Sequence, residues 1–163
     1  METKNRMQIV KDLPARKLTI TRLFDAAPAE VWKAWTESEF LDQWWAPKPW
    51  KAETKSMDFK EGGYWIYAMV GPDNTRHWAR VDFISINPGK GFEALDTFCD
   101  ENGIPNPEMP RMSWKNIFEA TGGGTKLTVV ISFQKDSDIQ QILEMGFEQG
   151  FSSALENLDE ILN

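Results

Sequence analysis

Apolar and polar residues alternate along most of the central part of the chain, as they do in β-strands with one buried face. The alternation is clearest from Lys126 to Phe133, where every second residue is apolar and is expected to point inward. Turns rich in glycine, proline and asparagine separate the alternating runs, and such short connections join antiparallel strands. The predicted strands, in chain order, are residues 16–24, 50–59, 64–70, 75–86, 91–99, 111–120 and 126–133.

Helical spacing of apolar residues occurs in two places, after the first strand and at the end of the chain. Apolar residues recur at three- and four-residue steps over residues 29–43, and a break near residues 36–38 predicts two short helices there. The same spacing continues from Ile139 to Leu162 and predicts one long C-terminal helix.

Two glycines lie one turn apart on the apolar side of this predicted long helix, Gly146 and Gly150. Each is expected to cost about 1 kcal/mol of helix stability relative to alanine. Two glycines with this cost on one helix face indicate that a neighbouring group occupies the space that larger side chains would fill. That neighbour is either a closely packed strand or a bound ligand.

The order of these elements predicts an α+β fold. A curved antiparallel sheet of about six to seven strands wraps the long C-terminal helix, with the two short helices after the first strand. One-sided alternation places one sheet face in solvent and the other against the helix, with an apolar cavity between them. Residues 1–15 are predicted to be an irregular N-terminal lead-in, and residues 16–163 a single domain.

Composition narrows the function classes. A chain of 163 residues fits one domain, and a net charge of −7 argues against nucleic acid and anionic membranes as partners. The only cysteine, Cys99, cannot form an internal disulfide, which favours a cytoplasmic location. The only histidine, His77, follows a hairpin turn and is expected to be exposed. One histidine excludes a histidine-rich metal site and a nucleophile triad, and we expect neither a metal nor a cofactor.

The candidate ligand-binding residues come from two inward strand faces and the C-terminal helix. Most are aromatic residues or methionines, which suit varied apolar shapes. Asn116 is the best polar candidate, because a buried amide needs partners. The alternative is that these side chains fill the interior completely. The predicted set is Trp65, Tyr67, Met69, Met112, Trp114, Asn116, Phe118, Met145, Phe147 and Phe151.

Other polar groups allow two interpretations each. The Asp58 carboxylate is either catalytic or, as we expect, accepts backbone N–H groups of the two glycines that follow it and so fixes a turn. Arg80 and Asp82 either anchor a ligand or, as the apolar residues beside them favour, lie on the outer face.

The acidic residues near Cys99 suggest either a cation site or, more commonly, a loose acidic loop. Asp96, Asp100 and Glu101 form this group. The same acidic setting is expected to raise the pKa of the thiol.

Several short motifs resemble those of the AHSA-like family of heat-shock-protein ATPase activator homologues, within the START/Bet v 1-like superfamily. Together they extend over residues 16–162. The resemblance implies a helix-grip fold and a hydrophobic ligand, and some superfamily members are enzymes. The motifs are Arg22-Leu23-Phe24-Asp25-Ala26 with Pro28, Val31-Trp32 and Trp35; Trp44-Trp45-x-Pro47; Asp58-x-x-x-Gly62-Gly63-x-Trp65; Gly71-Pro72-Asp73; and Gly146-Phe147-x-x-Gly150-Phe151-x-x-x-Leu155.

Three functions remain open, and the preferred one is binding of a hydrophobic or aromatic small molecule. The second is an interaction module, which predicts a filled cavity and an exposed apolar patch around Trp44, Trp45 and Trp50. A chaperone partner is expected less, because no co-chaperone domain precedes the matching residues. The third is an enzyme that uses Asn116 and Tyr67 for positioning, and no catalytic residue is assigned. Exposed aromatic residues make a homodimer an expectation as well.

Overall fold

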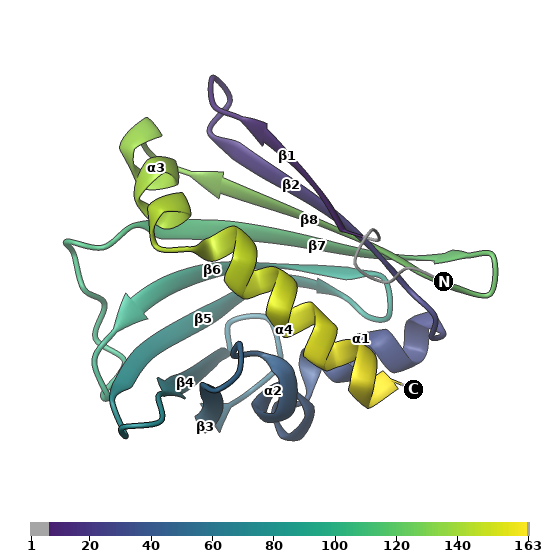
Figure 1. The fold of residues 1–163 in the computed structure, drawn as a ribbon, viewed down its shortest axis with the longest axis horizontal. Helices are drawn as coiled ribbons and strands as arrows, with labels where there is room; N and C mark the ends of the chain where they lie inside the picture. Colours follow the sequence, from purple (N-terminus) through teal and green to yellow (C-terminus); the bar gives the residue numbers. More distant parts are fainter. Residues whose placement is uncertain (1–6, 163) are drawn as a thin grey trace.

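The computed structural model describes residues 7–162. An eight-stranded sheet curves around the C-terminal helix in the order β1-β2-β8-β7-β6-β5-β4-β3, and every neighbouring pair is antiparallel (Figure 1). The predicted α+β helix-grip fold is confirmed. The elements are β1 Met7–Asp12, β2 Lys17–Phe24, α1 Pro28–Thr36, α2 Ser38–Trp44, β3 Lys51–Met57, β4 Tyr64–Val70, β5 Arg76–Asn87, β6 Gly91–Cys99, β7 Arg111–Thr121, β8 Gly124–Phe133, α3 Asp136–Glu144 and α4 Phe147–Leu162.

The strand that the sequence did not predict is β1, which lies inside the expected irregular lead-in of residues 1–15. It pairs with β2 from Met7 opposite Arg22 to Asp12 opposite Lys17, at an edge of the sheet. Most of its side chains are exposed, because an edge strand covers little of the core. The alternation that reveals a half-buried strand is therefore weak here. Residues 1–6 of the predicted lead-in lie outside the described residues.

The predicted long C-terminal helix is two helices, α3 and α4, separated at Met145 and Gly146. Gly146 has a φ of +86°, in the left-handed region that ends helices. The expected helical cost of a glycine therefore applies to Gly150, which lies inside α4, and not to Gly146.

The concave face of the sheet carries the core. On β8, Leu127, Val129, Ile131 and Phe133 are all buried, as predicted. Figure 1 shows α4 lying diagonally across this hollow. The α4 backbone lies close to α1, α2 and α3, whereas its backbone contacts with the strands are sparse. The space between α4 and the sheet is thus bridged by side chains.

One ion pair ties the end of α4 to the sheet. The Arg22 guanidinium on β2 is only 2% exposed and donates to both carboxylate oxygens of Asp159, at 3.2 and 2.5 Å. The same guanidinium donates to the backbone carbonyl of Leu23 at 2.7 Å. A buried pair with this bidentate geometry fixes the direction of the helix as well as its position.

Candidate functional site

An apolar cavity lies between the sheet and the junction of α3 and α4. Its volume is about 240 Å³. Most of the predicted ligand-binding residues line it, from β4, β7 and the helices. Of the predicted set, it includes Tyr67, Met69, Met112, Trp114, Met145, Phe147 and Phe151.

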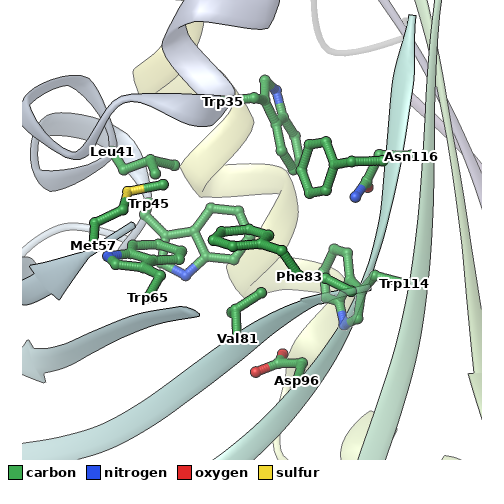
Figure 2. Close-up of a pocket in the computed structure, with 12 residues that line it drawn as sticks. Trp35, Leu41, Trp45, Met57, Trp65, Val81, Phe83, Asp96, Trp114 and Asn116 are labelled. Atoms are coloured by element: carbon green, nitrogen blue, oxygen red, sulfur yellow. The ribbon is translucent and has the colours of Figure 1, made fainter. Parts of the chain in front are cut away.

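The remaining predicted residues lie elsewhere. Trp65 and Asn116 line a second void of about 30 Å³, the space of one water molecule (Figure 2). The Asn116 amide is 2% exposed, and its oxygen has no hydrogen-bond partner among residues 7–162. Phe118 lines neither void and packs edge-on against Trp32 in the core, with ring centroids 5.3 Å apart. The larger cavity is therefore built without these three side chains.

Both glycines of the C-terminal motif line the larger cavity. A Cβ atom on Gly150 would meet only Pro47, at 3.8 Å, and one on Gly146 would meet nothing within 4 Å. In the part of the chain that the structure describes, no strand packs closely against either glycine. The space they leave belongs to the cavity.

Trp45 forms the wall between the two voids, and it was missing from the predicted set. Its indole N–H donates to the Tyr67 hydroxyl at 2.8 Å, and the Tyr67 ring stacks on Trp65 with centroids 4.1 Å apart. Burial raises the pKa of Tyr67 well above its usual value, and the nearby Asp96 carboxyl adds to this shift. The Tyr67 hydroxyl thus stays neutral at physiological pH. Because its oxygen accepts the Trp45 N–H, the O–H of Tyr67 can donate to another group.

Asp96 is the second residue that the sequence interpretation missed as a site residue. It lies on β6 rather than in an acidic loop, and its carboxyl group lines both voids. Burial raises the pKa of this carboxyl to about 7, and the indole N–H of Trp114, which faces it, opposes the shift in part. Strand parity was the available signal, because Phe92 and Ala94 are buried on the same face.

The other polar candidates lie outside the cavity. Arg80 and Asp82 pair on the outer face at 2.7 Å, while Ala79 and Phe83 point inward, as the apolar pattern predicted. The expected role of the Asp58 carboxylate is wrong: it pairs with Lys60, while the amides of Gly62 and Gly63 donate to backbone carbonyls.

The predictions for the single histidine and cysteine are confirmed. His77 is exposed and stacks on Trp50, with ring centroids 5.4 Å apart. The pKa of the Cys99 thiol is raised, chiefly by burial, and the neighbouring Asp100 and Asp96 carboxyls contribute.

The exposed apolar patch predicted around the tryptophan pair is wrong. Trp44 is completely buried, and its indole N–H donates to the Ala34 carbonyl at 3.0 Å. Trp45 and Trp50 are half-buried. These aromatic residues belong to the interior rather than to a docking surface.

The cavity wall is almost uncharged. Among residues 7–162, no lysine, arginine or histidine lines either void, and Asp96 is the only acidic residue that does. Within the same residues no group of histidine, cysteine and carboxylate side chains is arranged to hold a metal ion. No helix of the described chain has the length and apolar character to cross a membrane. The arrangement suits an apolar body with one polar group directed at Asp96 and Tyr67.

Comparisons with known proteins agree with this architecture. The family model described as activator of Hsp90 ATPase homolog 1-like protein matches residues 25–163. A protein from Arthrobacter aurescens, solved by NMR, is 32% identical with a TM-score of 0.89, over 95% of this chain and 90% of that chain. Crystalline Ms6760 from Mycobacterium smegmatis is 30% identical with a TM-score of 0.89, over 96% of both chains. The search of curated proteins found no match.

Proposed function

The chain belongs to the family of activator of Hsp90 ATPase homolog 1-like proteins, and from that premise we propose that it binds a small, mainly apolar aromatic ligand in the cavity beneath α4. The observation that carries the proposal is a cavity of about 240 Å³ in a core that is otherwise closely packed. An apolar cavity of about 150 Å³ accepts benzene, and pockets for larger ligands begin near 300 Å³. A one- or two-ring ligand therefore fits this space.

The lining supports an aromatic ligand more than an aliphatic one. Trp45, Trp114, Phe147 and Phe151 contact one another around the cavity, with ring centroids 5.4 to 6.3 Å apart. Edge-to-face contacts at such distances favour aromatic partners beyond the area they bury. Met69 and Met112 add flexible side chains that adapt to ligand shape.

The competing functions have less support. An interaction module was expected to have a filled interior and an exposed tryptophan patch, whereas the cavity is open and Trp44 is buried. An enzyme was expected to use Tyr67 and Asn116 together, but they line different voids. A cytoplasmic location belongs to the same proposal, with the free thiol of Cys99 as its support.

The test is ligand binding by 1-naphthalenemethanol, a neutral two-ring probe, measured by calorimetry and by thermal shift. We expect saturable one-to-one binding that raises the melting temperature, because a ligand of the native state stabilises it. Gly150→Leu places a side chain in the cavity and should weaken binding by at least about tenfold.

The matched control is Glu156→Leu, which adds the same side chain on the exposed face of α4. It should leave the affinity unchanged. Absence of probe binding, or equal affinities of wild type and Gly150→Leu, contradicts the proposed function.

A further inference from the structure

The inference rests on the proposed function and narrows its ligand class. We propose that the ligand carries a protonated amine, and that the Asp96 carboxylate holds this amine at the floor of the aromatic cavity. The ligand class is thus a hydrophobic aromatic amine.

Asp96 lies on a central strand, opposite Val81 on β5 and Met112 on β7. Two residues before it on the same face is Ala94, and two residues after it is Phe98. A carboxyl group here is surrounded by apolar side chains on four sides. Its strand lies away from both edges of the sheet.

The described residues supply no cation for this carboxyl. Among the described residues, no ion pair involves Asp96, and no lysine, arginine or histidine lines either void. The titratable groups whose pKa values it influences are Tyr67 on β4 and Cys99, three residues further along its own strand, and neither carries positive charge. Burying a carboxyl without a partner destabilises a protein. The residue thus has no evident structural use.

A bound ammonium group supplies the missing partner. It pairs with the carboxylate, and the surrounding rings stabilise it further through cation–π contacts, for which tryptophan is the best partner. Trp45 and Trp114 line the cavity beside Asp96, and the Tyr67 hydroxyl lies near the same carboxyl. A ligand with a carboxylate would instead meet like charge and no cation. The lining therefore discriminates against fatty acids and other anions.

The raised pKa of Asp96 adds a signature that a purely structural carboxyl lacks. With a pKa near 7, a large fraction of the carboxyl is protonated at neutral pH in the free protein. Binding of an ammonium ion stabilises the ionised form, so the protein releases a proton as the amine binds. A neutral ligand leaves this proton in place.

The experiment compares three probes with one ring system: 1-naphthylmethylamine, 1-naphthalenemethanol and 1-naphthoate. Calorimetry at pH 7 in two buffers of different ionisation enthalpy gives both affinity and proton release. We expect the amine to bind at least about tenfold more tightly than the alcohol and to release a proton, and the acid to bind most weakly.

The variant Asp96→Asn should abolish the advantage of the amine over the alcohol and the proton release on amine binding. Asp82→Asn removes the same charge from the outer face and should preserve both. If the alcohol binds and the amine gains nothing, or if Asp96→Asn keeps the amine advantage, the amine inference is overturned and the proposed function stands. If none of the three probes binds, both are overturned.

Discussion

At the scale of single residues, the Asp96 carboxyl, which we propose binds the ligand, is expected to lower the stability of the free protein. This carboxyl is partly buried among apolar side chains, and its pKa of about 7 lies far above the usual value of 3.8. Between these two pH values the native state holds a proton that the unfolded chain has released. The free energy of unfolding therefore falls as the pH rises from about 4 to about 7.

Asp96→Asn should remove this pH dependence, because an amide resembles the protonated carboxyl at every pH. We expect the variant and the wild type to be similarly stable near pH 4. As the pH rises, the free energy of unfolding of the variant should exceed that of the wild type by a growing amount. The difference should reach at most about 4 kcal/mol above pH 7. Urea unfolding at several pH values measures the difference. Parallel stability curves would show that the carboxyl is not desolvated.

The sequence located some of these residues but not their neighbours. Asn116 was correctly placed on an inward strand face, yet which void it meets depends on the packing of Trp35 and Trp45, which no local pattern encodes. Asp96 was grouped with Asp100 and Glu101 because three acids lie close in sequence. The end of the strand separates them, because Asp96 lies within β6 on the face of Phe92 and Ala94, whereas Asp100 and Glu101 follow its last residue, Cys99.

At the scale of elements, the division between α3 and α4 decides the shape of the cavity. Apolar spacing continues across the division, since Ile142 and Phe151 both face inward. Apolar spacing alone therefore predicts one helix where the structure has two. The positive φ of Gly146 ends α3, and the backbone turns there. The periodic pattern does not indicate the backbone conformation of a single residue.

The same substitution is expected to have opposite effects on stability at the two glycines. Gly150→Ala should stabilise the protein by up to about 1 kcal/mol, because the residue is helical and its new methyl group meets only Pro47 at 3.8 Å. Gly146→Ala should destabilise it by about 1–2 kcal/mol, because alanine disfavours a left-handed conformation. Thermal unfolding of both variants measures the contrast. Equal effects would contradict the helix break.

At the scale of the whole molecule, local patterns predicted the meander from β3 to β8, since each strand pairs with the next along the chain. They did not predict that β2 pairs with β8, more than a hundred residues away in sequence, although the register runs from Lys17 opposite Ser132 to Phe24 opposite Thr125. The edge strand β1 had neither a clear alternation nor a motif to reveal it.

The resulting grip is closed at one end of α4 and hollow at the other. Arg22 and Asp159 join the last turns of the helix to β2, whereas Gly146 and Gly150 border the cavity near its start. Removing one charge of the buried pair leaves the other uncompensated. Asp159→Asn and Arg22→Met should therefore each destabilise the protein by about 3–5 kcal/mol.

The double variant Arg22→Met/Asp159→Leu separates the ion pair from the grip itself. Apolar replacement of a whole buried pair is often neutral, so the double variant should recover most of the stability that either single variant loses. Because the pair lies at the far end of α4 from the cavity, the folded double variant should bind 1-naphthalenemethanol with wild-type affinity. Urea unfolding and calorimetry on the same samples measure both quantities. Single-variant losses below about 1 kcal/mol, the level of a surface pair, would contradict the clamp. Lost binding in a stable double variant would show that the two ends of the helix are coupled.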